Sequence, residues 1–401
     1  MNKKISFLKQ LGIVVFGFTV WHCAEEPIEN DLSHLNLSVD TLTLRDISAA
    51  PYWVNPNLGN HPKLYLGEKN NRKIPVTFFK FPDHLFWDYY LDSSNTFDSL
   101  HFVLYSDDSV LTVESCPNLY FSPDSQFDEL NTFSPDVESF STAEWTDLSS
   151  PSVHINTDTL GIFTHTKIVW DLMSLASTLS DTIDSNLVRT FALNYVTEDS
   201  NFVEFYSREA TSGSRDPQVN LFFKHETVVD DDSTRIDELN GTVYVSKDLS
   251  VIEPELSWTD SSDSEFTIDY GHGRRATMSL KFDSLVAGSI IRSANLFLNV
   301  DTTQGGNEAY VIIDPIESPL DTSLNIFETD PYDAIGYPFR VSSRVSDGQM
   351  IISLKNFLQN VSMGNEVNIG FKVISDVTNS PFEPIPFDLN NAKLEILYVS
   401  N

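Results

Sequence analysis

Hydrophobic and polar residues alternate with period two along much of the chain, as they do in strands that bury one face. In the second half, the runs 277–283 and 294–301 show this alternation, and in the first half the runs 76–81 and 100–105 repeat it. Because Gly288 lies between the two later runs, we expect a turn or a short crossover there and a paired unit of two strands. The dominant signal is therefore β-structure.

Both halves continue with a strand, a short helix and another strand. In the first half, strand 167–172 leads to Leu residues at helical spacing in 172–179. In the second half, strand 350–354 leads to the same spacing in 354–361. The strands that follow and the last strand of each half also correspond, at 191–196 and 217–223 and at 367–373 and 392–398. This order predicts an all-β protein with two tandem jelly-roll-like β-sandwich domains, each with a short helix.

The boundary between the halves is expected in a run of acidic residues. The length of 401 residues suits two domains. The segment 226–240 contains Asp230, Asp231 and Asp232, which a core would not accept unpaired. We therefore expect β-sandwich domain 1 over 37–225, an acidic linker over 226–240 and β-sandwich domain 2 over 241–401.

The N-terminus is typical of an exported protein. Three lysines precede an apolar run from Leu11 to Trp21, which is the length of a signal-peptide core. Cys23 follows, in a position that resembles the lipid-modified cysteine of bacterial lipoproteins. The resemblance implies a signal peptide over 1–22, an acidic tether over 23–36 and an acyl (palmitate) anchor on Cys23, with localisation at the exposed face of the bacterial outer membrane. Cleavage elsewhere with release, or an uncleaved membrane anchor, are the alternatives.

Charge and cysteine content narrow the choice of partners. The chain has 58 Asp and Glu against 25 Lys and Arg, for a formal net charge of −33, and this charge repels nucleic acid. If Cys23 carries lipid, Cys116 is left without a disulfide partner, so we expect it to be a small, half-buried residue. The membrane, through the lipid anchor, and an extracellular glycan or surface protein are the expected partners.

Two segments resemble a known family. The sequence from Arg275 to Leu285 and the sequence from Ile290 to Leu298 look like the opening of DNRLRE-type domains, which are extracellular β-sandwiches related to carbohydrate-binding modules. The segment 205–209, which contains Ser-Arg-Glu, and the later segment 217–221 resemble the closing signature of these domains. The opening is clear in the second half and the closing in the first. The resemblance implies a carbohydrate-binding function without catalysis.

The sequence contains no signature of the common hydrolases, nucleotide-binding loops or zinc proteases, and we expect no enzyme and no zinc site. Calcium is considered because oxygen ligands are abundant. The segments 230–232 and 260–265 are candidates, but neither follows the EF-hand pattern and solvated loops are the favoured interpretation. Arg208 is expected to pair with a carboxylate elsewhere in domain 1 and not with Glu209, because neighbours on a strand point to opposite faces.

Exposed aromatic rings are what a sugar-binding surface needs, because the apolar face of a pyranose stacks on them. The densest clusters contain Trp87, Tyr89 and Tyr90 in one segment and Trp53 in another, and these four are the candidate ligand-binding residues. Packing in the core is the alternative for each. The segment 271–275 is a local basic spot that suits either an anionic glycan or a turn.

The sequence therefore predicts a non-catalytic surface lipoprotein that binds extracellular polysaccharide. A structural or adhesive component of a surface protein assembly, with no glycan ligand, is the alternative.

Overall fold

The computed structural model confirms the predicted all-β fold, which consists of antiparallel sheets with a few short helices. The residues that the structure describes are 38–107, 111–137, 140–148, 151–157, 164–181, 186–195, 201–210, 214–230, 233–254, 264–281, 285, 287–303, 305–317, 326–327 and 329–400. Cys23, the predicted signal peptide and the predicted tether lie outside them. No helix among these residues is long and apolar enough to cross a membrane.

Two sheets form one unit, called here the outer unit, which combines the first described strands with the last. In strand order, one sheet contains β1 (Ser38–Leu44), β24 (Ile385–Ser400), β18 (Ile290–Val300) and β22 (Gln349–Ser353), with β16 (Glu265–Ile268) also paired to β24. The other contains β20 (Ile326–Phe327), β2 (Ile47–Val54), β17 (Arg274–Leu280), β23 (Phe371–Ser375), β19 (Tyr310–Pro315) and β21 (Val341–Arg344). Helix α5 (Lys355–Ser362) packs on β18.

The chain between these parts forms a second unit, called here the inserted unit. Its first sheet contains β14 (Ser233–Tyr244), β13 (Gln218–Asp230), β6 (Asn95–Ser106), β10 (Thr164–Asp171) and β9 (Ser152–Thr157). Its second contains β15 (Lys247–Val251), β5 (Val76–Phe81), β11 (Arg189–Asn194), β7 (Asn118–Ser122) and β8 (Thr146–Asp147), and a small sheet contains β12 (Phe202–Tyr206), β3 (Lys63–Lys69) and β4 (Arg72–Ile74). The short helices are α2 (Leu85–Asp88), η2 (Val113–Ser115), α3 (Ser134–Val137), η3 (Thr142–Glu144), η4 (Met173–Leu175) and α4 (Ala176–Leu179).

Each unit has its own core between its sheets, and the alternation in the sequence explains why. On β18, the side chains of Ala294, Leu296 and Leu298 are completely buried. On β6 of the inserted unit, Phe102 and Leu104 are buried in the same way. Between the buried residues of β18 the side chains are partly exposed, so one side of this strand faces the core, whereas on β6 Val103 is completely buried as well.

The two units pair their strands in the same way. In the inserted unit β6 pairs with β10 and β13, and β5 pairs with β11; in the outer unit β18 pairs with β22 and β24, and β17 pairs with β23. The predicted pairing of 277–283 with 294–301 is wrong, because β17 and β18 lie in different sheets. The segment around Gly288 is the crossover between them.

An additional pair of strands completes each sandwich. In the inserted unit this pair comes after the other strands in the sequence, whereas in the outer unit it comes before them. β14 and β15 are the last strands of the inserted unit and add to β13 and β5. β1 and β2 precede the inserted unit, yet they add to β24 and β17 of the outer unit. The first strands of the described chain therefore close the last domain.

This arrangement corrects the predicted division into 37–225 and 241–401. The segment 38–54 belongs with the outer unit, and β15 belongs with the inserted unit. The described residues of the predicted linker 226–240 belong to β13 and β14, which pair as a hairpin, and Glu226, Asp230 and Glu238 are tolerated there because they are exposed to solvent. A run of acidic residues shows that a segment is not buried in a core, but it does not show that the segment is not a strand.

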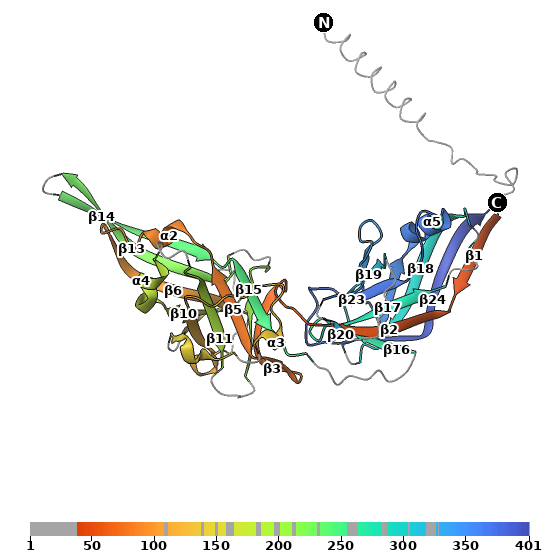
Figure 1. Ribbon diagram of the computed structural model, residues 1–401, viewed down its shortest axis with the longest axis horizontal. Coiled ribbons are helices and arrows are strands. Elements are labelled where there is room, and N and C mark those ends of the chain that lie inside the picture. The colour runs from red at the N-terminus through yellow and green to blue at the C-terminus, as the bar shows by residue number, and fades with distance from the viewer. Residues whose placement is uncertain are drawn as a thin grey trace, which may run out of the picture.

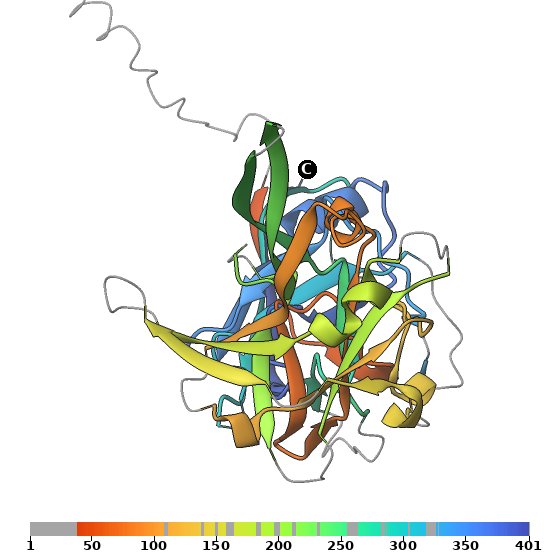
Figure 2. The same cartoon turned by 90° about the vertical axis from the view of Figure 1, so that its left-hand side faces the viewer.

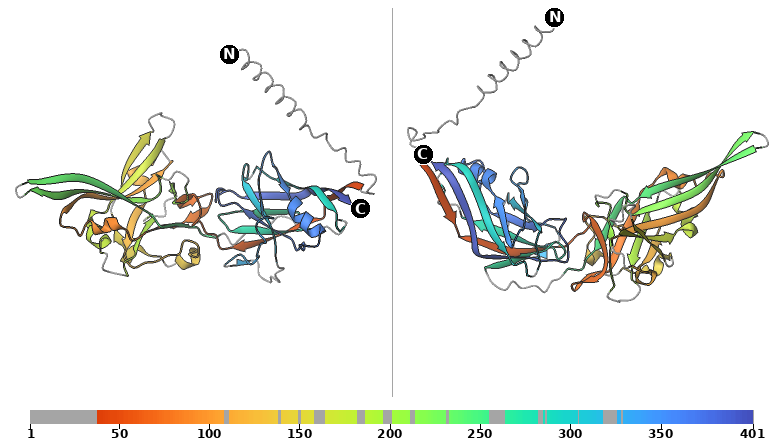
Figure 3. Two further views of the ribbon diagram at one scale, coloured as in Figure 1. Left: turned by 90° about the horizontal axis from the view of Figure 1, so that it is seen from above. Right: turned by 180° about the vertical axis from the view of Figure 1, so that it is seen from behind.

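The units lie end to end in an elongated molecule (Figures 1 and 3). The β13–β14 hairpin projects at one end and rises above the body of the protein in Figure 2, whereas the start of β1 and the end of β24 lie at the opposite end (Figure 1). Where the units meet, a small core joins Leu58, Tyr65 and Ile74 to Phe382 of the outer unit. Beside it, the Arg72 guanidinium forms a buried ion pair with Asp269.

Candidate functional site at the junction of the two units

A cleft of about 440 Å³ lies where the two units meet. This volume falls within the range of ligand-binding sites in proteins. Residues from both units and from the segment that connects them line it: Asn55, Pro56, Asn57, Asn60, Leu130, Asp269, Tyr270, Gly273, Arg274, Arg275, Ile312, Arg340, Ile374, Ser375, Asp376 and Val377. Amides, guanidinium groups, carboxylates and a tyrosine thus converge on one space.

Three arginines line the cleft, and the ion pairs of two of them, Arg275 and Arg340, determine its charge. Arg275 forms an ion pair with Asp330, which also accepts a hydrogen bond of 2.8 Å from the Lys372 ammonium group. Burial opposes ionisation of Asp330, but Arg275 and Lys372 outweigh it and hold the pKa of this carboxyl below its usual value. The side chain of Arg340 is half exposed, and its Nε lies 3.7 Å from the Asp314 carboxylate. Arg340 is therefore positioned to bind an oxygen-rich ligand with its exposed part.

Hydrogen bonds fix the inner wall of the cleft. The Tyr270 hydroxyl donates to the Asn57 carbonyl over 3.0 Å, and burial raises the pKa of this hydroxyl, so it stays protonated at neutral pH. The Asn57 amide in turn donates to the Glu129 carbonyl over 3.0 Å. Because Leu130 follows Glu129, this contact places Leu130 in the wall. A Cβ at Gly59 would collide with the same Glu129 carbonyl, so the two segments touch along their backbones.

The aromatic residues predicted to bind a ligand lie elsewhere. Trp87, in α2, is only 1% exposed and packs in the core of the inserted unit, where its Nε1 donates to the Pro82 carbonyl over 3.1 Å. A sugar cannot stack on this ring, so the prediction for Trp87 is wrong. The residue anchors α2 because its large apolar ring gains more from burial than from display.

Tyr89 and Tyr90 are partly exposed but packed. Their exposed fractions are 36% and 37%. The ring of Tyr89 lies 5.2 Å from that of Phe223, and the ring of Tyr90 lies 5.4 Å from that of Phe97. Trp53 is half-buried on β2 opposite Arg274, outside the residues that line the cleft. The four predicted residues therefore do not converge on one site.

The basic segment 271–275 forms a turn and also lines part of the cleft. The bridge between Asp269 and Arg274 closes the turn that leads into β17. Gly273, Arg274 and Arg275 then line the cleft.

Cys116, predicted to be a small, half-buried residue, is buried, and burial raises the pKa of its thiol to about 11. A thiol with such a pKa is a poor nucleophile at neutral pH.

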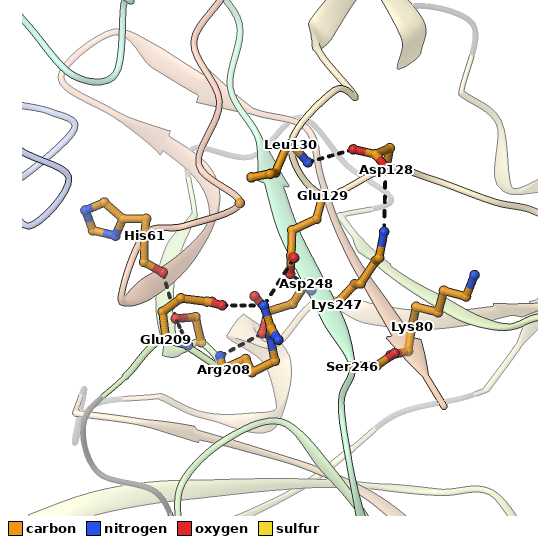
Figure 4. Close-up of polar contacts among 12 residues, drawn as sticks. His61, Lys80, Asp128, Glu129, Leu130, Arg208, Glu209, Ser246, Lys247 and Asp248 are labelled. Atoms are coloured by element: carbon orange, nitrogen blue, oxygen red, sulfur yellow. Dashed lines mark hydrogen bonds and ion pairs between the residues drawn. The ribbon is translucent and has the colours of Figure 1, made fainter. Parts of the chain in front are cut away.

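Behind the cleft wall, Arg208 meets three carboxylates (Figure 4). Its guanidinium lies 3.2 Å from Glu129 and 2.7 Å from Glu209, and its backbone N–H donates to Asp248 over 2.8 Å. The predicted ion pair with a distant carboxylate is confirmed by Glu129. The prediction that Arg208 and Glu209 do not pair is wrong, because both lie in a turn after β12 and not on a strand.

The segments predicted as calcium candidates give no site in the described chain. Asp230 is exposed at the end of β13. Residues 231 and 232 and residues 260–263 lie outside the described residues. The Arg208 cluster was not among the candidates, because its carboxylates are far apart in the sequence.

Comparison with known proteins yields no family. No protein-family model matches the chain, and no curated protein matches it. A solved structure of "Enterococcal surface protein, partial N-terminal region" is 8% identical over 86% of this chain and 84% of its own, with a TM-score of 0.16. The "atomic structure of Sulfolobus Turreted Icosahedral Virus" is 9% identical over 90% of both chains, with a TM-score of 0.13. These scores are too low to support an argument about fold or function.

Proposed function

We propose that the protein is a non-catalytic lipoprotein of the bacterial outer membrane that binds extracellular polysaccharide in the cleft between its two units. The observation that carries the proposal is the cleft lining, in which the half-exposed Arg340 faces the same space as Tyr270 and the amides of the connecting segment. Sugar hydroxyls bind to amide, guanidinium and carboxylate groups, and a tyrosine ring adds apolar contact.

The charge of the cleft favours a polysaccharide with carboxylate or sulfate groups. The whole chain is strongly acidic, so the exposed part of the Arg340 guanidinium offers an anionic sugar a local attraction, although Asp269 and Asp376 also line the cleft. Guanidinium groups bind such anions through two parallel hydrogen bonds. The resemblance to DNRLRE-type domains supports a carbohydrate ligand in general.

The shape of the molecule supports a surface anchor at Cys23. The predicted tether leads into β1, and β1 starts at the end of the molecule opposite the β13–β14 hairpin (Figure 1). An anchor there would hold the outer unit near the membrane and direct the inserted unit away from it. Labelling of cells with a palmitate analogue tests the anchor: we expect label on the wild type and none on Cys23→Ser, and an equal signal from both would contradict it.

A polysaccharide array tests the cleft. The chain from Ala24 onward is compared with Arg340→Gln, which removes one cationic group from the cleft. Arg344→Gln is the matched control, because Arg344 has the same side-chain exposure as Arg340 to within one per cent, at 48% against 49%, and lies outside the cleft lining. We expect Arg340→Gln to lose about tenfold in affinity, which corresponds to one hydrogen bond to a charged group. Equal binding by all three proteins would contradict the site.

A second candidate function is a structural or adhesive role, and the β13–β14 hairpin favours it. Val228, Val229 and Ile236 are 73%, 58% and 61% exposed on this hairpin. β14 lies at the edge of its sheet in the described chain, and an exposed edge accepts a strand from another protein. Because the hairpin is acidic, the expected partner is a protein with a basic strand. Cross-linking from this hairpin to a stoichiometric partner on intact cells would support it.

A further inference from the structure

The three carboxylates around Arg208 form a compact group of oxygen ligands. Glu129 comes from the loop between β7 and β8, Glu209 from the turn after β12, and Asp248 from β15. One oxygen from each lies within 4.8 Å of the others, and their side chains turn toward one another (Figure 4). Oxygens that bind one calcium ion at 2.3–2.6 Å lie up to about 5 Å apart, so this spacing fits a single ion.

Two carboxylate oxygens of the cluster accept no hydrogen bond from the described residues. Arg208 binds Glu129 Oε2, Glu209 Oε1 and, through its backbone, Asp248 Oδ2. The Asp248 N–H donates to Glu129 Oε1 over 2.9 Å. Asp248 Oδ1 and Glu209 Oε2 are buried, and neither accepts a hydrogen bond from the described residues. Asp248 is completely buried, so its second oxygen has no access to bulk water.

The charges of the cluster are also unequal. One guanidinium faces three carboxylates, and Lys247 beside them directs its ammonium group to Asp128, 3.6 Å away. A buried carboxylate in such surroundings either retains a proton or gains a cation.

We propose that Glu129, Glu209 and Asp248 bind a calcium ion, with Asp248 Oδ1 and Glu209 Oε2 among its ligands. The donors are carboxylate oxygens, which suit hard cations and not zinc or copper. Calcium is favoured over magnesium because it accepts irregular arrangements of six to eight oxygens, whereas magnesium requires a near-ideal octahedron. Glu209, with 21% of its side chain exposed, offers the route by which the ion enters.

Calcium at this site would connect three separate segments of the inserted unit. It would also fix the loop that carries Leu130, because Glu129 lies between the ion and the Asn57 amide. If the proposed function holds, calcium would therefore make one wall of the polysaccharide cleft more rigid.

Calorimetric titration with calcium chloride tests the site. The full chain is first treated with a chelator and dialysed, and no glycan is present, so the result does not depend on the proposed function. We expect one ion per chain and, at a calcium concentration one hundred times Kd, a rise in Tm of about 5–10 °C. Magnesium chloride at the same concentration should raise Tm less. A folded protein that neither takes up calcium nor changes its Tm would overturn the proposal.

Two variants locate the ion. Asp248→Asn keeps the shape of the side chain, and Glu209→Gln changes a more accessible ligand; each should weaken calcium binding at least tenfold. Glu144→Gln is the matched control, since it removes one exposed negative charge from the same loop as Glu129. Circular dichroism confirms that each variant is folded. Calcium binding that is unchanged in both cluster variants would overturn the assignment to these residues.

Discussion

Two arginine clusters, one at the junction and one in the inserted unit, differ in their balance of charge. At the junction, Asp269 is the carboxylate that pairs with Arg72 among the described residues. Asp269 also accepts the His272 backbone N–H over 2.9 Å, and the Arg72 guanidinium donates to the Pro381 carbonyl. In the inserted unit, Arg208 is shared by three carboxylates. The charges of the Arg72–Asp269 pair cancel, so the pair requires no further ion and can hold the two units together permanently. An unbalanced cluster needs another positive charge, and for this reason we assign a cation to it.

The largest effect is expected from breaking the balanced pair. Arg72→Met leaves the Asp269 carboxylate buried at the junction without its guanidinium, which costs about 3–5 kcal/mol of the free energy of unfolding. Urea denaturation measures this loss.

Arg235→Met is the control for that experiment. Arg235 pairs with Asp237 over 2.7 Å but is 69% exposed, so its loss should lower the free energy of unfolding far less than the loss of Arg72. Equal losses of the free energy of unfolding in the two variants would show that the Arg72–Asp269 pair does not hold the units together.

A loss of similar size is expected from Trp87→Ala, although its cause is different. The ring fills the core of the inserted unit, so its removal leaves a cavity and costs about 3–5 kcal/mol. Thermal unfolding measures the loss. A variant as stable as the wild type would show that the ring does not fill the core.

The unbalanced cluster predicts a smaller, pH-dependent effect. Asp248 has a raised pKa in the folded protein and faces Glu129, Glu209 and Arg208. Its contribution to stability is therefore present below its unfolded pKa and is lost as pH rises through its folded pKa. In chelator, the stability of Asp248→Asn relative to the wild type should rise by about 1–3 kcal/mol between pH 4 and neutrality, because the amide stays neutral while the wild-type carboxyl loses its contribution.

The difference in free energy of unfolding between the two proteins, measured from pH 4 to pH 8, checks this. Calcium should reverse its sign at neutral pH, since only the wild type then gains the ion. A difference that is constant over the whole pH range would contradict the raised pKa.

The smallest effect is expected at the hairpin. Val228→Ser combined with Ile236→Ser changes exposed residues, so the free energy of unfolding should shift by less than about 0.5 kcal/mol. A large loss of stability by thermal unfolding would show that the hairpin packs against the protein itself and is not a free surface.

The sequence predicts local structure better than long-range pairing. The alternation in β18 and the helical spacing in α5 depend only on neighbouring residues, and both appear where they were expected. The positions of β1–β2 and β14–β15 in the two sandwiches could not be predicted, because both pairs fit either sandwich by pattern alone. The candidate sites illustrate the same limit: Arg208 and the basic segment 271–275 stand out in the sequence, whereas Asn57, Arg340 and Asp248 join them only through the fold.

Hydrogen exchange of the backbone amides, with and without the polysaccharide that the protein retains, tests most directly whether the junction binds it. We predict slower exchange in the presence of polysaccharide at 57–60 and 374–377, which line the cleft, and no change at 85–91 around Trp87. Protection confined to 85–91 or to the β13–β14 hairpin, with the cleft segments unchanged, would contradict the account.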